Sequence, residues 1–286
     1  MGLTWSIATT ASGSVIVVAD SGVFRSAPGG AEWERVDAEI GEIWLHSLYV
    51  GPSGTLYIWS DLHAYRSLDE GSQWSMIYQT PINQGIRTIA EHPGGALFIG
   101  RTRAGIARST DQGATWTQAN DGLWFTDAIR IAVALDGSVL ASSGAYGGLF
   151  RSTDLGTHWN PIHIGLPEMS AVTGIMILPS GGILVCSYHH GLFLTTDFGA
   201  TWVPRSTGLV NPDVVSLARS SQGLLVACTP GAGIFRSTDE GVGWQQTGPH
   251  HTRVSRLLFD SRGTLLACPL ITRGEMNIPD NFEVHR

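Results

Sequence analysis

Five aspartates of this chain share one sequence context, and an acidic side chain that recurs in this way could bind calcium or take part in catalysis. Each follows a Ser or Thr by two residues and precedes a Gly by two and a Trp by five. Each copy of the motif contains this one acidic residue as its shared carboxylate. Asp and Ser side chains commonly close tight turns by hydrogen bonding to backbone groups a few residues further along the chain. We therefore expect structural turns at Asp69, Asp111, Asp154, Asp197 and Asp239.

A second set of residues, between the copies of the motif, could bind a ligand. Guanidinium groups pair with carboxylate or phosphate, and aromatic rings stack on sugars. The arginines in this set, with Arg103, could form an anion-binding funnel, although charged residues are also ordinary in solvated loops. The candidate ligand-binding residues are Trp44, His46, Arg87, Arg101, Trp124, Arg130, Tyr146, Tyr188, His189 and Arg256.

Glycoside hydrolysis would need two carboxylates roughly 5–10 Å apart across a cleft. The sequence does not show whether any two acids face each other, and acids in loops are often solvated turn residues. The candidates are Asp20, Glu42, Asp61, Asp127 and Asp213.

Histidine and cysteine show no metal-ligand spacing. The pairs His189-His190 and His250-His251 are adjacent in sequence, so their side chains point to opposite sides of an extended segment. The cysteines at 186, 228 and 268 are spaced by 42 and 40 residues and are expected to be buried apolar positions. Phosphate-binding loops and nucleophile elbows are absent from the sequence. We predict no metal and no cofactor.

The motif also sets the spacing of the structural elements. Its tryptophans fall at 33, 74, 116, 159, 202 and 244, with gaps of 41 to 43 residues, and the first copy has Pro28 in place of Asp. Short runs of β-forming residues between turn residues predict four strands, A to D, in each repeat. In the repeat that ends at Trp159, strands A to C are expected at 129–134, 139–142 and 149–152. One strand A position is apolar in every repeat: Ile7, Leu48, Ile89, Ile131, Ile175, Leu217 and Leu257.

These repeats predict an all-β fold, a seven-bladed β-propeller of four-stranded antiparallel blades that forms a single domain over residues 1–286. A WD40 propeller would show Gly-His and Trp-Asp dipeptides, which this chain lacks. The last copy has lost the motif, so we expect a degenerate, weakest blade there and a ring closed by packing alone. The expected blades are 1–41, 42–83, 84–125, 126–169, 170–211, 212–252 and 253–286.

The motif resembles the Asp-box, or BNR repeat, of sialidases, xyloglucan-cleaving glycosidases, sortilin-type receptors and photosystem II assembly factors. The resemblance covers nearly the whole chain and implies the propeller fold, but the family includes enzymes, receptors and scaffolds. Sialidases carry an Arg-Ile-Pro sequence, whereas this chain has Arg130-Ile131-Ala132, so sialidase activity is not expected. The compact repeats are most similar to the photosystem II assembly-factor group.

Composition limits the partners. Lys plus Arg is 17 and Asp plus Glu is 24, a net charge of −7, which disfavours a nucleic-acid partner. No apolar run approaches the roughly 20 residues of a membrane span. The N-terminus does not have the pattern of a signal peptide, so a cytoplasmic location is expected for the chain as written, and a secreted or periplasmic one if a leader was removed.

In a propeller of this kind, the D–A and B–C loops gather on one face and the motif turns on the other. We therefore predict a non-catalytic binding or assembly module that uses the D–A and B–C loops for a protein partner or a small anionic or carbohydrate ligand. The alternative is a carbohydrate-active enzyme, a glycoside hydrolase or lyase, with paired carboxylates at the channel mouth. Short loops without catalytic insertions favour the binding module.

Overall fold

The computed structural model describes residues 4–27, 32–38, 40–41, 44–143, 148–167, 171–248, 254–260 and 262–269. Within them the chain forms 26 β-strands. Among these residues there is no helix with the length and apolar character needed to cross a membrane.

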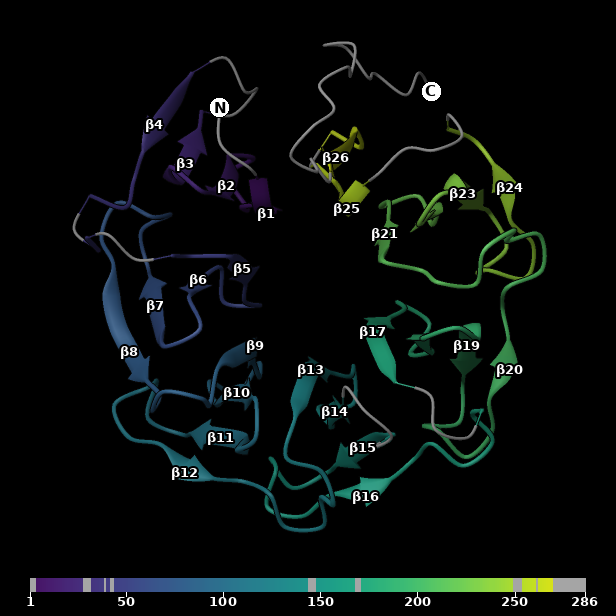
Figure 1. The fold of residues 1–286 in the computed structure, drawn as a ribbon, viewed down its shortest axis with the longest axis horizontal. Helices are drawn as coiled ribbons and strands as arrows, with labels where there is room; N and C mark the ends of the chain where they lie inside the picture. Colours follow the sequence, from purple (N-terminus) through teal and green to yellow (C-terminus); the bar gives the residue numbers. More distant parts are fainter. Residues whose placement is uncertain are drawn as a thin grey trace.

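The strands form antiparallel sheets in which chain order and spatial order agree, and the sheets are arranged as a ring (Figure 1). Strand A of the successive sheets is β1 (Thr4–Thr9), β5 (Ser47–Val50), β9 (Ile86–Glu91), β13 (Ala128–Val133), β17 (Val172–Ile177), β21 (Ser216–Arg219) and β25 (Val254–Phe259). Strand B is β2 (Val15–Ala19), β6 (Leu56–Trp59), β10 (Leu97–Arg101), β14 (Val139–Ser143), β18 (Ile183–Ser187), β22 (Leu225–Thr229) and β26 (Leu265–Pro269). Strand C is β3 (Gly22–Ser26), β7 (His63–Ser67), β11 (Gly105–Ser109), β15 (Leu149–Ser152), β19 (Gly191–Thr195) and β23 (Gly233–Ser237). Strand D is β4 (Trp33–Arg35), β8 (Ser75–Gln79), β12 (Thr117–Gln118), β16 (Asn160–Pro161), β20 (Val203–Pro204) and β24 (Gln245–Gln246).

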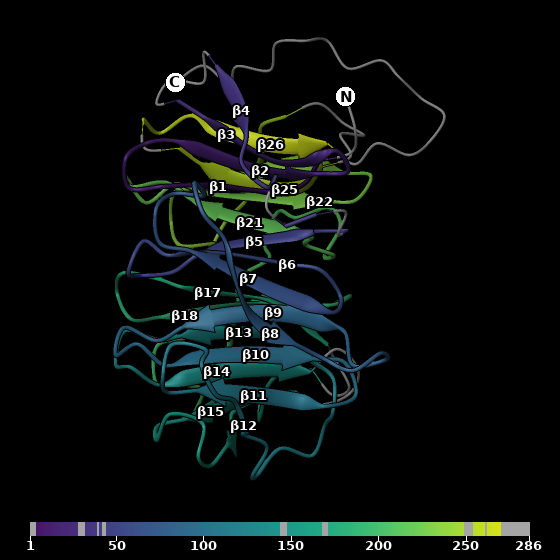
Figure 2. The ribbon, with the colours of Figure 1, turned by 90° about the vertical axis from the view of Figure 1, so that its left-hand side faces the viewer.

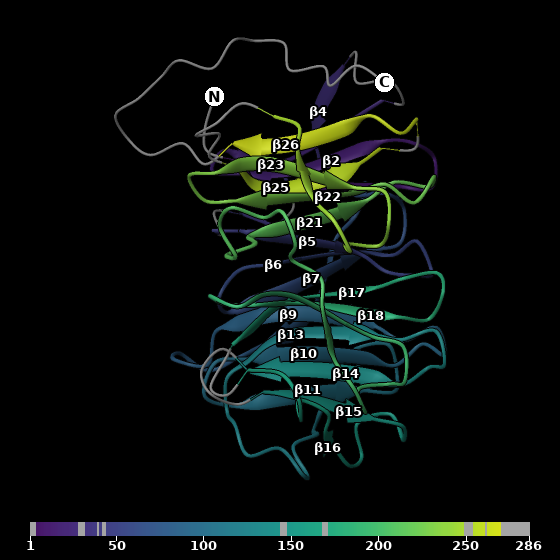
Figure 3. The same ribbon diagram turned by 90° about the vertical axis from the view of Figure 1, so that its right-hand side faces the viewer.

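The position of a strand in its sheet sets its place in the ring. The A strands surround the axis, and the D strands run around the rim (Figure 1). Seen from the side, the inner strands cross the thickness of the ring, so that their connecting loops gather on two opposite faces (Figures 2 and 3). Strands A to C of the repeat that ends at Trp159 were predicted to within one residue.

The prediction of seven four-stranded blades was wrong. The described residues form six four-stranded blades, numbered here in chain order, and β25 with β26 forms only a two-stranded sheet, the C-terminal hairpin. The repeat count relied on the apolar strand A position, which the hairpin keeps at Leu257. A full blade also needs the motif turn between strands C and D and its Trp, and the sequence after β26 has neither. The expected weak blade beyond residue 269 lies outside the described residues.

The C-terminal hairpin lies between the ends of the ring. Strand β25 packs against β21 on one side and against β1 on the other. Arg256 Nη1 also donates a hydrogen bond to Ser6 Oγ at 3.0 Å, so closure by packing is supplemented by this side-chain bond.

The core consists of the B strands and the faces between neighbouring blades. Every residue of β10, β14, β18 and β22 is buried, which explains their near-continuous apolar sequences. One apolar cluster, for example, joins Ile77 of blade 2 to Ile89 and Leu97 of blade 3. The predicted strand A core position is buried at Leu48, Ile89, Ile131 and Leu257. The blades therefore hold one another through their flat faces.

The motif turns have one repeated hydrogen-bond pattern. In blade 2, Ser67 Oγ donates to Asp69 Oδ1 at 2.7 Å and accepts from the Gly71 N–H at 2.8 Å. Asp69 Oδ1 also accepts the Gln73 N–H at 2.9 Å. Gly71 has φ of +91°, a conformation that favours glycine. The same Ser or Thr to Asp bond recurs at Asp111, Asp154, Asp197 and Asp239.

These hydrogen bonds stabilise the charged form of each motif aspartate, so its pKa is lowered. The pKa falls to about 2 for Asp111, chiefly through the Thr115 hydroxyl, and to about 2 for Asp197, chiefly through the Thr195 hydroxyl. The five aspartates therefore carry negative charges that are committed to holding turns.

The motif also joins neighbouring blades. Trp159 Nε1 donates to the Ala119 carbonyl of the preceding blade at 3.0 Å. From strand C, Arg108 Nη1 donates to the carbonyl of Leu155 in the next turn at 2.8 Å. The arginine before each motif is thus a structural residue in the blades where this bond forms.

Candidate functional site

The B–C loops and the D–A loops lie on one face of the ring, called here the loop face. Backbone hydrogen bonds join a B–C loop to the D–A loop that follows its blade in one case and to the D–A loop that precedes its blade in another. The Ile86 N–H donates to the Asp61 carbonyl at 2.8 Å, and the Tyr188 N–H donates to the Ala171 carbonyl at 2.9 Å. The bonded residues are 25 and 17 positions apart in the chain. Most of the candidate ligand-binding residues lie on or beside these loops.

Two of the candidate catalytic acids hold loop backbone. Asp127 Oδ1 accepts the N–H of Arg103 at 2.9 Å, and Asp213 Oδ1 accepts the N–H of His189 at 2.7 Å. Arg103 and His189 occupy equivalent B–C loop positions with positive φ, 59° and 63°. A carboxylate at this position thus caps a strained loop residue, a structural task that repeats in two blades.

The other candidate acids have separate partners. Asp20 Oδ1 accepts the Trp5 Nε1–H at 2.5 Å, and Asp61 Oδ1 lies 3.3 Å from His46 Nε2. Glu42 lies outside the described residues. The described acids thus have different local contacts.

One histidine on the loop face is oriented by an acid. His189 Nδ1 lies 3.0 Å from Asp213 Oδ2, and its ring lies against Tyr188, with the ring centroids 3.7 Å apart. No group of three or more His, Cys, Asp or Glu that could hold a metal ion occurs within the described residues. His250 and His251 lie outside them.

Two candidate arginines, the axial arginines Arg130 and Arg256, occupy the same strand A position. Arg130 pairs across its sheet with Ser142, and Arg256 pairs with Cys268; these partners directly follow Ala141 and Ala267, which pair with the apolar strand A residues Ile131 and Leu257. The same position in the other blades has a small residue: Ser6, Ser47, Thr88, Gly174 and Ser216. Small neighbours leave room for the two long side chains near the axis of the ring.

The charges of the axial arginines act on each other. The surrounding protein lowers the pKa of Arg130, and the positive charge of Arg256 lowers it further. The side chain of Arg130 is nevertheless accessible to solvent, as expected for a group that lines an opening rather than one packed in the core. Its Nη1 donates to the Ile129 carbonyl at 2.8 Å.

The remaining candidates on the loop face are dispersed. Arg87 is exposed and bonded through Nε to Thr102 Oγ1 at 2.7 Å. Trp44 is 81% exposed, while Trp124 packs edge-on against Phe150, with the ring centroids 4.4 Å apart. Tyr146 lies outside the described residues. The funnel of five arginines stays a prediction.

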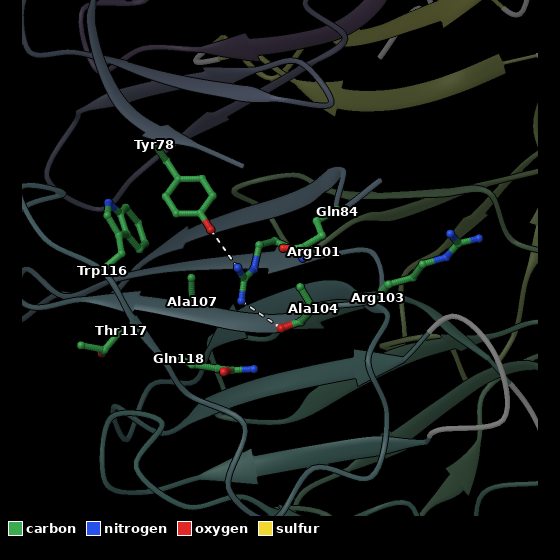
Figure 4. A pocket seen from close by; sticks show the side chains of 9 residues that line it. All are labelled: Tyr78, Gln84, Arg101, Arg103, Ala104, Ala107, Trp116, Thr117 and Gln118. Atoms are coloured by element: carbon green, nitrogen blue, oxygen red, sulfur yellow. Dashed lines mark hydrogen bonds between the residues drawn. The ribbon is translucent and has the colours of Figure 1, made fainter. Parts of the chain in front are cut away.

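Arg101 lines a separate pocket of about 370 Å³ between strand D of blade 2 and blade 3 (Figure 4). The pocket is lined by Tyr78, Gln84, Arg101, Arg103, Ala104, Ala107, Trp116, Thr117 and Gln118. Sequence reasoning selected Arg101 but missed Tyr78, Trp116 and Gln118. A signal was available in the repeat. Two residues after the strand B partner of the apolar strand A position, every other repeat has a small residue or proline, and only this one has a long side chain, Arg101.

Comparisons with known proteins agree on the fold. No family model matches this chain, and no curated protein matches it significantly. Solved structures do match, among them a GH74 enzyme from Niastella koreensis, at 16% identity and a TM-score of 0.74 over 94% of this chain and 51% of that one. The chain therefore spans about half the length of that enzyme.

Two further structures match over most of both chains. A streptogramin B lyase has 15% identity and a TM-score of 0.75, with 93% of this chain and 90% of that one covered. A structure of YCF48 bound to D1 peptide has 18% identity and a TM-score of 0.72, with 94% and 91% covered. At such identities the likeness shows the fold alone: the chain is a β-propeller.

Proposed function

We propose that this protein is a non-catalytic binding module that docks an acidic segment of a protein partner at the axial arginines. The observation that carries the proposal is that Arg130 and Arg256 occupy the same position of two A strands, the strands that surround the axis of the ring (Figure 1). Two like charges in proximity raise the free energy of the site, and a bound carboxylate lowers it. The other blades have small residues at this strand A position, so only the A strands β13 and β25 present an arginine there.

The chemistry of the loop-face acids supports binding rather than hydrolysis. Asp127 and Asp213 are engaged by backbone N–H groups of the neighbouring loops. A glycosidase needs two carboxylates that converge on one bond. The motif that resembles the Asp-box is consistent with either class, but the compact repeats are most similar to the photosystem II assembly-factor group. YCF48, a propeller of similar length, has been solved with a bound peptide.

Binding of a hexaglutamate peptide tests the proposal, with hexaglutamine as the neutral control. Because the chain has a net charge of −7, non-specific attraction of an acidic peptide is not expected. The double variant Arg130→Gln/Arg256→Gln should weaken binding about tenfold or more in calorimetry. The matched variant Arg219→Gln/Arg262→Gln removes the same charge near the A–B turns of the opposite face and should leave binding unchanged. Equal affinities for the two double variants would refute the proposal.

A second candidate, an enzyme of the lyase or glycosidase class, is favoured by the contact between His189 and Asp213. An acid that holds Nδ1 of a histidine leaves Nε2 to act as a general base. Streptogramin B and xyloglucan are suitable test substrates, with products followed by mass spectrometry. Turnover that His189→Gln abolishes would support the enzyme, and absence of turnover of both substrates leaves the binding module as the better account.

A further inference from the structure

We propose that the pocket at Arg101 is a second, separate binding site, which takes a small carboxylate-bearing group. This inference is independent of the axial arginines. The pocket lies between the rim strand β8 and blade 3, where Arg101 stands at the end of β10 (Figure 4). Its volume of about 370 Å³ is within the lower part of the range of small-molecule sites, roughly 300–1,000 Å³.

Arg101 is a buried cation that has only neutral partners. Its side chain belongs to a residue only 9% exposed. Nη1 donates to the Tyr78 hydroxyl at 2.9 Å, and Nη2 donates to the Ala104 carbonyl at 2.9 Å. No acid is among the residues that line the pocket, and Arg101 forms no ion pair in the described part of the chain. A buried charge without a counter-charge is costly, so a carboxylate that enters the pocket supplies what the site lacks.

The repeat shows that this arginine is a departure from the blade pattern. Arg101 is the last residue of strand B and pairs with Gly105, the first residue of strand C. Arg101 lies two residues after Ile99, the strand B partner of the apolar strand A position, and the residues at this register in the other four-stranded blades are small: Ala19, Ser60, Ser143, Ser187 and Thr229. A small residue at this point completes the blade without difficulty. The long charged side chain is therefore not required by the fold.

The side of the pocket opposite Arg101, formed by strand D of blade 2, also differs from the equivalent strand in other blades. Tyr78 lies on β8, which has five residues where the later D strands have two. The pairing of β7 with β8 has a register shift between Ala64 and Tyr65, and such bulges re-aim side chains. Tyr78 stands four residues after its motif Trp. At that position, Asn120 of blade 3 instead accepts a backbone N–H, that of Ile106.

The remaining lining residues fit a carboxylate on a small flat or aliphatic body. Tyr78 packs edge-on against Trp116 with the ring centroids 5.0 Å apart, which fixes its hydroxyl beside Arg101. Gln84 and Gln118 add amide donors, and Ala104 and Ala107 leave space. Figure 4 shows Arg101 between Tyr78 and Ala104, with Trp116 at one end and Arg103 extending away at the other. One buried guanidinium matches a single planar carboxylate better than a phosphate dianion.

The test follows benzoate binding by NMR at the indole N–H of Trp116, with benzamide as the neutral analogue and phenyl phosphate as the competing anion. We expect benzoate to bind and benzamide not to bind. Arg101→Gln should weaken benzoate binding about tenfold or more, because charged hydrogen bonds are lost. Tyr78→Phe, which keeps the ring, should weaken it by a smaller factor. The Arg130→Gln/Arg256→Gln variant should leave it unchanged, which separates this site from the loop-face site.

Peptides distinguish the source of the carboxylate. Acetyl-Ala-Ala-Phe with a free C-terminus presents a terminal carboxylate, and the same peptide as its C-terminal amide presents none. Acetyl-Ala-Glu-Phe-amide presents a side-chain carboxylate. Tighter binding of either acid peptide than of benzoate would identify a peptide ligand, and tighter binding of benzoate a free acid. The proposal fails if benzoate and benzamide bind equally, or if no carboxylate binds at millimolar concentration. It also fails if phenyl phosphate binds more tightly than every carboxylate. Benzoate affinities of both Arg101→Gln and Tyr78→Phe equal to that of the wild type would overturn it as well.

Discussion

The motif aspartates show how one residue type can be repeated for a structural reason. Each accepts hydrogen bonds from a hydroxyl and from the backbone of its own turn, as Asp111 does from Ser109 and Thr115. The bonds stabilise the ionised form and lower the pKa. The carboxylates therefore belong to the turns, and ligand chemistry must come from other residues.

The lowered pKa values make stability depend on acid pH. The unfolded chain has ordinary aspartates, with pKa near 3.9, whereas the pKa of Asp111 and Asp197 in the folded chain is about 2. Between these values the unfolded state binds more protons, so the stabilisation is complete above about pH 4 and is lost as pH falls towards 2. Urea unfolding should show this fall, and Asp111→Asn/Asp197→Asn should show a shallower one. A wild-type stability that stays constant from pH 4 to pH 2 would contradict the assignment.

At the scale of elements, blades 2 to 6 are each joined to the preceding blade through the motif tryptophan. Trp159 is 1% exposed, and its Nε1 donates to the Ala119 carbonyl at 3.0 Å. Four other motif tryptophans make the same contact: Trp74, Trp116, Trp202 and Trp244. The motif therefore stabilises the interface between blades as well as the turn that contains it.

Trp159→Phe tests this role of the motif. The substitution removes one buried hydrogen bond and leaves a small cavity, which together should lower the free energy of unfolding by about 2–3 kcal/mol. Trp33→Phe is the matched control, because Trp33 is 50% exposed and its copy of the motif lacks the aspartate. Urea unfolding of both variants measures the difference. Equal losses for the two would show that the inter-blade bond contributes little.

For the whole molecule, the C-terminal hairpin closes the ring with two strands rather than four. Its strand β25 packs between β21 and β1, and Leu257 is 4% exposed there. Blades contact mainly their neighbours, so a weakened closure should loosen both ends of the ring before the far side.

Leu257→Ala should lower the free energy of unfolding by roughly 2–4 kcal/mol. Hydrogen exchange should then accelerate in β1 and β21 more than in β13, which lies on the far side of the ring (Figure 1). Uniform acceleration in all three strands would instead indicate that the ring unfolds as one cooperative unit.

Local patterns predicted the elements well where the physics is local. The strands of the repeat ending at Trp159 follow from runs of β-forming residues between turn residues, and the apolar position of strand A follows from burial. The blade count failed because Leu257 keeps that apolar position while the chain beyond it lacks the motif. Tyr78 was missed because the local sequence of a rim strand does not reveal whether a side chain faces solvent or a neighbouring blade.

The repeat, the propeller fold, the turn-holding role of the motif and the set of candidate side chains could be predicted from the sequence, because all of these depend on residues close together in the chain. Which of these side chains contact one another became clear only from the folded ring. Arg101 bonds to Tyr78 of the preceding blade, and Asp127 and Asp213 accept hydrogen bonds from the backbone of neighbouring loops. These contacts join different blades, and their geometry depends on how the blades pack around the ring.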